Sequence, residues 1–165
     1  MRVILTPGDI TIATTLACVR QGVNREAGKV NLKAGSQDAM TTELVGAFGE
    51  VAFARWANVY PDMTTHLRAG SPDATFGSLT VDVKTTRRLQ DPRWRLDIRP
   101  DKMFDAYVFA AADWATVDLK GWVTQTQALV LLERHGGPWV FESDLLPMDS
   151  MTEEAFREFA VVVHR

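Results

Sequence analysis

The sequence has few of the residues that cross-link chains or bind soft metals. Its 165 residues include one cysteine, Cys18, and three histidines, His66, His135 and His164. A single cysteine cannot form an internal disulfide or a thiolate metal cluster. The histidines do not have the spacing of zinc ligands. We therefore expect no zinc site, and we predict that Cys18 is a small buried side chain on a helix.

Long apolar runs are also absent. No stretch of the sequence is long enough to cross a bilayer. The first residues carry only a three-residue apolar stretch before Pro7 and Gly8, which is too short for a signal peptide. We therefore expect no membrane association and a cytoplasmic location. Hydrophobic residues make up 46% of the chain, which is enough for one domain over residues 1–165.

The charge is unevenly distributed. The net charge of −3 gives no argument for nucleic-acid binding by itself. The segment from Lys84 to Lys102, however, holds seven basic and three acidic residues, so it carries +4 and the rest of the chain carries −7. A local basic field on an acidic protein can attract a polyanion. A solvated surface loop would have a similar composition, so the charge alone leaves both interpretations open.

Hydrophobic periodicity predicts helices at both ends of the chain and strands between them. The first helix is expected to begin after Asp9 as its N-cap and to end at Gly28. Helices are predicted at 10–26, 41–59, 125–132 and 151–161. Strands are predicted at 64–68, 73–76, 79–86, 94–99, 105–111, 122–124 and 139–142. This order predicts an α/β domain with a central mixed sheet flanked by helices.

The strand from Leu79 to Thr86 carries the residues of greatest chemical interest. Because successive side chains of a strand point to opposite faces, the apolar residues at 79, 81 and 83 are expected to face the core. Asp82 and Lys84 then share the other face with Thr80 and Thr86 and lie roughly 6.5–7 Å apart along it. This spacing leaves room for a metal-bound water or a phosphate between them.

A second carboxylate comes from Pro72-Asp73. The tight turn expected at Gly77-Ser78 would fold the strand at 73–76 back beside the strand at 79–86, which can bring Asp73 near Asp82. Two neighbouring carboxylates repel each other unless a cation lies between them. Oxygen ligands favour a hard cation such as Mg²⁺ or Mn²⁺.

Glu50 is the third candidate acid. It is the only charged residue between Leu44 and Ala54, within a predicted helix. A charge in so apolar a segment is costly unless it is paired. Gly46 and Gly49 lack side chains, which would let another backbone approach Glu50 closely. We therefore expect Glu50 to point at the metal site or at Lys84.

In these residues the sequence resembles the PD-(D/E)XK nuclease superfamily. The resemblance rests on Gly49-Glu50 in the helix, then Pro72-Asp73, then Asp82-Val83-Lys84, and it covers roughly residues 42–111. It implies a restriction-endonuclease-like αβββαβ core and Mg²⁺-dependent hydrolysis of DNA, with Mn²⁺ as a substitute. It also implies that Asp73 and Asp82 bind the metal, that the Val83 carbonyl could be a further ligand, and that Glu50 holds the metal or a bound water. Lys84 would orient or activate the attacking water, or stabilise the developing charge.

One departure from the family pattern concerns residues 87–104. The family has a helix between its third and fourth core strands, whereas this segment contains Pro92 and Pro100. Either the strand expected at 94–99 replaces that helix, or the predicted topology is wrong.

Several residues after the motif could contact DNA. The threonines and arginines could bind phosphate, with ordinary surface charge as the competing interpretation for the arginines, and Trp94 could stack on a base. The other four tryptophans, Trp56, Trp114, Trp122 and Trp139, are expected to be packing residues. The predicted nucleic-acid-binding residues are Thr86, Arg87, Arg88, Arg93, Trp94 and Arg95.

Two alternatives to a nuclease remain open at this stage. One is a catalytically inactive nucleic-acid-binding or protein-interaction module on the same fold. The other is an inhibitory protein whose acidic surface mimics nucleic acid, which the basic segment disfavours. If the protein is a nuclease, its small size suggests that a second copy or a partner protein supplies any sequence specificity. The sequence does not distinguish an endonuclease from an exonuclease.

Overall fold

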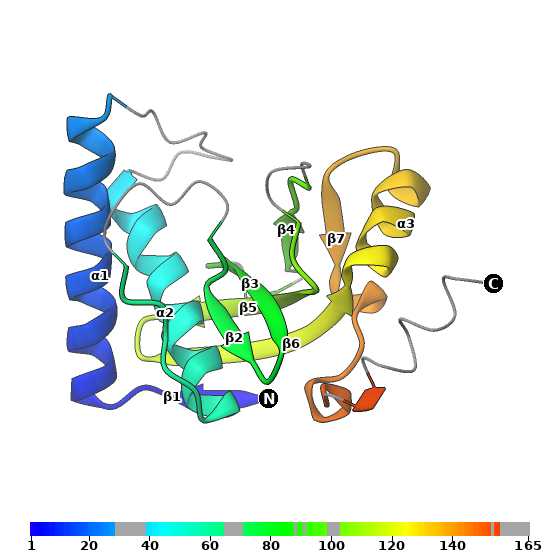
Figure 1. Cartoon of the computed structure of the whole chain (residues 1–165), viewed down its shortest axis with the longest axis horizontal. Coiled ribbons are helices and arrows are strands. Elements are labelled where there is room, and N and C mark those ends of the chain that lie inside the picture. Colours follow the sequence, from blue (N-terminus) through cyan, green and yellow to red (C-terminus); the bar gives the residue numbers. More distant parts are fainter. Residues whose placement is uncertain are drawn as a thin grey trace.

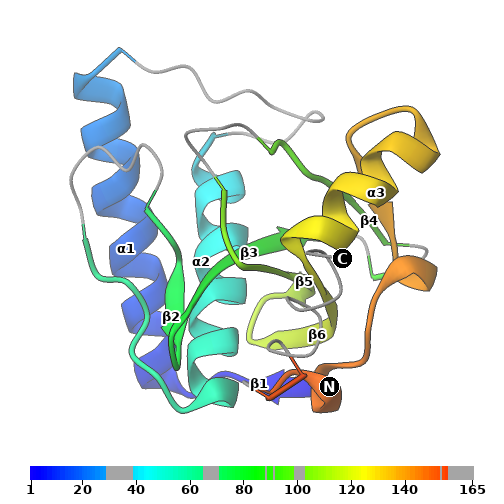
Figure 2. The ribbon, with the colours of Figure 1, turned by 45° about the vertical axis from the view of Figure 1, so that its right-hand side comes forward.

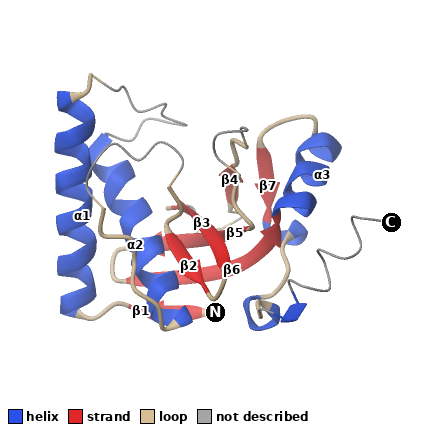
Figure 3. Cartoon of the chain, in the orientation of Figure 1, coloured by secondary structure: helices blue, strands red, loops and turns tan. Residues whose placement is uncertain are grey.

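The computed structural model describes residues 1–28, 39–64, 71–87, 89–90, 92–98, 103–152 and 154–155. Within them the chain forms a mixed α/β fold around a curled sheet (Figures 1 and 3). The helices are α1 (Pro7–Glu26), α2 (Ala39–Ala57) and α3 (Gln125–His135), with short 3₁₀ helices η1 (Glu142–Asp144) and η2 (Met148–Ser150). The strands are β1 (Arg2–Ile4), β2 (Ala74–Phe76), β3 (Leu79–Thr86), β4 (Arg93–Arg95), β5 (Ala106–Asp113), β6 (Thr116–Thr124) and β7 (Trp139–Phe141).

The first helix begins earlier than predicted, because its cap differs. Thr6 is the N-cap, and Pro7 occupies the first turn. The Asp9 backbone N–H donates to the Thr6 hydroxyl (3.3 Å), and the Asp9 carboxylate accepts from the Thr6 backbone N–H (2.8 Å). Asp9 is therefore the third residue of a capping box and not the cap itself. Cys18 lies on the exposed side of α1, so its predicted burial is wrong.

The main sheet has the order β1–β6–β5–β3–β2. Gly77 has a positive φ of 61° in the turn that folds β2 back along β3, as the sequence predicted. β3 and β5 are parallel, whereas the other neighbouring pairs are antiparallel, so the predicted mixed sheet is confirmed. Strand β1 was not predicted; it is only three residues long and pairs with the distant β6.

Both faces of the sheet are covered, which explains the apolar composition of β5. Its even-numbered residues, such as Val108, join Val81 and Val83 in a core under α1 and α2. Tyr107 and Phe109 point the other way, into a second core with α3, β4 and β7. Figure 2 shows α1 and α2 on one side and α3 with β4 on the other. Strand β3, which carries Asp82 and Lys84, lies in the sheet between these two layers.

The connection from β3 to β5 contains a strand where the nuclease family has a helix. β4 spans Arg93–Arg95, shorter than the predicted 94–99, and pairs with β7 in a separate two-stranded sheet. Within the part of this connection that the structure describes, no helix occurs. The strand predicted at 64–68 and the helix predicted at 151–161 lie mostly outside the described residues.

Two of the tryptophans predicted to be packing residues differ in their burial. Trp122 is fully buried, as expected, but Trp114 is 68% exposed in the turn between β5 and β6, so its prediction as a packing residue is wrong. Among the helices described, none is both long and apolar enough to cross a bilayer.

Candidate active site

Asp73 lies beside β3, immediately before β2. Its backbone N–H donates to the carbonyl of Val81 (2.9 Å), the residue that pairs with Ala74 in the β2–β3 register. Its carboxylate turns back to the strand, where Oδ2 accepts the Val83 backbone N–H (2.8 Å). The hairpin thus brings Asp73 next to the Asp82-Val83-Lys84 segment. The Val83 group that contacts Asp73 is its backbone N–H. The predicted metal-binding group of Val83 is its carbonyl, which this contact does not involve.

Asp82 and Lys84 lie on the same face of β3, as the alternation predicted. Their side chains converge, so that Lys84 Nζ lies 2.6 Å from Asp82 Oδ2. The expected gap for a water or a phosphate between them is therefore closed in this conformation. Asp82 is buried, whereas the Lys84 side chain remains 33% exposed. The ammonium group is thus the part of the pair that solvent reaches more easily.

Glu50 is buried in α2 and has a partner that the sequence analysis missed. Arg20 Nη1 on α1 lies 2.8 Å from both Glu50 carboxylate oxygens. The two side chains are each only 9% exposed. The predicted partner of Glu50 was the metal site or Lys84, whereas the structure pairs it with this guanidinium. A lone arginine among the buried positions of α1 was the available sequence signal, but its partner lies thirty residues away.

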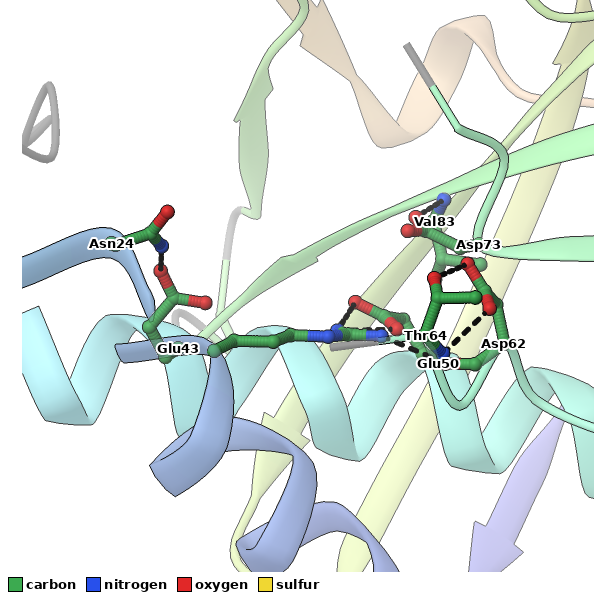
Figure 4. A network of polar contacts seen from close by, with 8 residues as sticks. Asn24, Glu43, Glu50, Asp62, Thr64, Asp73 and Val83 are labelled. Atoms are coloured by element: carbon green, nitrogen blue, oxygen red, sulfur yellow. Dashed lines mark hydrogen bonds and ion pairs between the residues drawn. The ribbon is translucent and has the colours of Figure 1, made fainter. Parts of the chain in front are cut away.

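Arg20 also connects Glu50 to the segment before Asp73. Its Nη2 donates to the Asp62 carbonyl (3.0 Å), and the Asp62 backbone N–H donates to the Asp73 carbonyl (3.1 Å). The Asp62 carboxylate is held in turn by the backbone N–H and hydroxyl of Thr64, both at 2.8 Å. Figure 4 shows Glu50, Asp62, Thr64 and Asp73 gathered at one place. This network fixes the backbone that places Asp73.

Gly49 lets α2 lie close to β3. A Cβ atom built on Gly49 would lie 1.8 Å from Thr85 Oγ1, so no side chain fits there without a shift. The same test at Gly46 finds no atom within 4 Å. The predicted close approach is therefore confirmed at Gly49, where a side chain and not a backbone approaches, and wrong at Gly46. Gly49 sets the distance between Glu50 and the strand that carries Asp82.

The carboxylates influence each other's protonation. Burial, followed by the negative charges of Glu50 and Asp82, raises the pKa of Asp73 well above its ordinary value. Burial by itself lowers the pKa of Lys84, but the charge and hydrogen bond of Asp82 outweigh it, so the pKa is raised. Lys84 is therefore a protonated ammonium at neutral pH.

The donor chemistry fits a hard divalent cation, although the acids already have protein partners. Glu50, Asp73 and Asp82 offer only oxygen atoms, which Mg²⁺ and Mn²⁺ prefer. The repulsion that raises the pKa of Asp73 is the kind that a cation relieves. Among the residues that the structure describes, however, no three carboxylate, histidine or cysteine side chains are already arranged around a metal position. A cation at Asp82 would have to compete with the Lys84 ammonium.

The residues predicted to bind nucleic acid do not all have the expected positions. Arg87, Arg93 and Arg95 are exposed, and Thr86 is half-buried. Trp94 is 2% exposed and donates its indole N–H to the Ala110 carbonyl (2.7 Å), so it is a core residue and cannot stack on a base. Arg88 lies outside the described residues.

No protein-family model matches this sequence, and searches of curated proteins and of solved structures find no significant similarity.

Proposed function

We propose that this chain is a metal-dependent nuclease that hydrolyses phosphodiester bonds of DNA, with Mg²⁺ as the cofactor and Mn²⁺ as a substitute. The observation that carries the proposal is the convergence of Asp73, Asp82 and Lys84 at the β2–β3 hairpin, with Glu50 close enough to act on Asp73. The αβββαβ core of restriction endonucleases is part of the proposal, with β4 in place of one helix. The preference for DNA over RNA and the cytoplasmic location come from the sequence argument alone.

The residues would divide the work by their chemistry. Asp73 and Asp82 would hold the cation, with the Val83 carbonyl as a further oxygen donor. Glu50, fixed by Arg20, would maintain the negative charge beside them. A bound Mg²⁺ would polarise the phosphoryl oxygen and lower the pKa of a coordinated water. In the hydrolysis, the oxygen of water would form a bond to phosphorus and release a proton to solvent, while the bond from phosphorus to the leaving oxygen breaks and that oxygen takes up a proton from solvent.

Lys84 has the charge needed to stabilise the transition state. Its raised pKa keeps it protonated, which favours stabilisation of the phosphoryl oxygens over removal of a proton from water. Of the roles that the sequence left open for this lysine, the geometry therefore supports the electrostatic one best.

A nucleic-acid-binding module without catalysis is the second candidate. It is favoured by one observation: Glu50 and Asp82 are already paired with Arg20 and Lys84, so the acids are compensated without any metal. The basic residues that follow β3 serve either function. A test must therefore measure binding and cleavage separately.

The test is a cleavage assay on supercoiled plasmid, linear duplex and single-stranded DNA, with Mg²⁺, Mn²⁺ or chelator. We expect metal-dependent cleavage, a loss of about 10²–10³-fold for Lys84→Gln, and at least as large a loss for Asp82→Asn. Asp118→Asn is the matched control, because Asp118 lies on β6 in the same sheet and pairs with the exposed Arg2. This control should retain full activity.

Titration with Mn²⁺ separates the two candidates. A nuclease should bind Mn²⁺ in a way that Asp73→Asn and Asp82→Asn each weaken. DNA binding without either metal binding or cleavage would support the binding module and exclude the nuclease.

A further inference from the structure

We propose that the outer face of the β4–β7 sheet binds unpaired nucleotides, with Trp139 as the stacking surface and Arg93 and Arg95 as the phosphate contacts. This inference rests on the proposed function and deepens it, because it names single-stranded segments of DNA as the substrate class. The proposal depends on which side chains of β4 and β7 point away from the core, which the sequence alone could not determine.

The alternation in β4 and β7 separates a core face from an outer face. Trp94 and Val140 are partners in the register and are both buried. Arg93, Arg95, Trp139 and Phe141 therefore point to the opposite face. The two arginines are exposed, and the two aromatic residues are half-buried. Figure 1 shows these two strands beside α3, beyond the end of β3.

On the outer face, aromatic rings lie next to guanidinium groups. Arg95 lies directly opposite Trp139 in the register, and the Arg93 guanidinium carbon lies 5.1 Å from the centre of the Trp139 ring. Phe141 is opposite Arg93 and contacts the edge of the His135 ring, with ring centres 5.0 Å apart. The Arg93 guanidinium lies over the Trp139 ring and Arg95 is its register partner, so an aromatic surface for a base and positive charges for its phosphates lie together on this face.

Two acids next to β7 among the described residues, Asp144 and Glu142, are already paired. Asp144 is paired with His135 at 3.0 Å, accepts the Phe141 backbone N–H at 2.9 Å, and has a side chain only 8% exposed. Glu142 pairs with Lys120. These pairings limit the repulsion that an approaching phosphate would meet. The charge of the face is therefore complementary to nucleic acid.

Unpaired nucleotides fit this face better than duplex DNA. In a duplex the flat sides of the bases are covered by their neighbours, so a protein ring can stack only on a base that has left the helix. A half-buried tryptophan flanked by arginines offers stacking to any base, without the side-chain hydrogen bonds that read a sequence. β4 follows β3 in the chain and contacts it, so this face belongs to the element next to the strand that carries Lys84.

The experiment measures binding in chelator, where cleavage cannot occur. The probes are a fluorescein-labelled 20-nucleotide single strand and its duplex, with heparin as a polyanion that has no bases. The wild-type protein should bind the single strand more tightly than the duplex. Trp139→Leu should weaken single-strand binding about 5- to 100-fold and leave heparin binding unchanged. Trp139→Phe should restore most of the loss.

Two further variants keep the test decisive even if Trp139→Leu folds poorly. Arg93→Gln with Arg95→Gln should weaken binding of both the single strand and heparin. Arg134→Gln, an exposed arginine in the last turn of α3, should change neither. Equal affinity for the single strand and the duplex, or single-strand binding unaffected by loss of the Trp139 ring, would overturn the proposal. Single-strand binding without cleavage in metal would retain this face and reject the nuclease.

Discussion

The two faces of the sheet differ in how deeply their ion pairs are buried. Under α1 and α2, the Arg20–Glu50 pair is sealed, with both side chains 9% exposed and both carboxylate oxygens contacted by one nitrogen. On the face of β5's Tyr107, Lys84 pairs with Asp82 but remains one-third exposed. A buried ion pair can thus serve as a fixed support, while a half-exposed pair stays accessible for chemistry. Asp73, at the edge between them, is influenced by both.

The largest effect is expected from breaking the buried Arg20–Glu50 pair. Arg20→Leu leaves Glu50 buried without this cation, so we expect a loss of about 3–5 kcal/mol in the free energy of unfolding. Urea denaturation followed by circular dichroism measures it. Arg20→Leu combined with Glu50→Gln should recover much of the loss, because a neutral amide then replaces the buried Glu50 carboxylate.

The control for this prediction is an exposed ion pair. Arg2 pairs with Asp118 at 2.8 Å on the surface, so Arg2→Gln should leave the unfolding midpoint nearly unchanged. If both arginine variants had the same small effect, Arg20 would not be a buried support, and the contrast between the two faces would fail.

The next effect tests how closely α2 must approach β3. Gly49→Ala forces its new methyl group against Thr85 Oγ1, so we expect a loss of about 1–3 kcal/mol in stability. Thr85→Ala removes that oxygen and should make Gly49→Ala much less costly, which a double-mutant cycle measures.

Gly46→Ala is the matched control on the same helix. Because open space surrounds Gly46, the substitution should stabilise the protein by about 0.5–1 kcal/mol through helix propensity. A similar loss at both glycines would show that the space next to Gly49 does not matter.

The smallest expected effect concerns Asp73 and pH. Its pKa is higher in the folded protein than in the unfolded chain, so the folded state binds more protons between the two pKa values. Stability should therefore decline as pH rises through this window and stay reduced above the folded pKa. Asp73→Asn keeps an oxygen for the Val83 N–H and should remove that decline.

The measurement is the free energy of unfolding in chelator across the acidic and neutral range. The difference between Asp73→Asn and wild type should grow with pH and then level off. Addition of Mg²⁺ should reduce the difference, because a bound cation stabilises only the wild-type carboxylate. A difference of the opposite sign would mean that Asp73 is ionised at a favourable site without metal.

Local sequence signals predicted the elements that depend on neighbours in the chain. The alternation from Leu79 to Thr86 gave β3, and Gly77-Ser78 gave the turn that brings Asp73 to it. A lone acid in an apolar helix marked Glu50 as a residue with a specific partner. These features are encoded over a few residues, so periodicity and turn chemistry suffice to find them.

Long-range contacts were beyond the reach of such signals. Nothing near Arg20 indicates that its partner lies on the next helix. Trp94 sits between two arginines, and the alternation alone allows either the ring or the guanidinium groups to face the core. Burial against Phe109 decides it, and this contact depends on how the sheet curls. Sequence reasoning therefore chose the wrong tryptophan for an exposed role.

The pairing of β1 with β6 has a consequence for the order of folding. Arg2 and Asp118, which face each other across these strands, are separated by 116 positions. During synthesis α1 and α2 emerge from the ribosome long before β6. Much of their apolar face therefore stays uncovered until the later strands are made. Contacts over such separations close slowly. We therefore expect the first strand to dock last, and the growing chain to be most vulnerable to aggregation before β5 and β6 emerge.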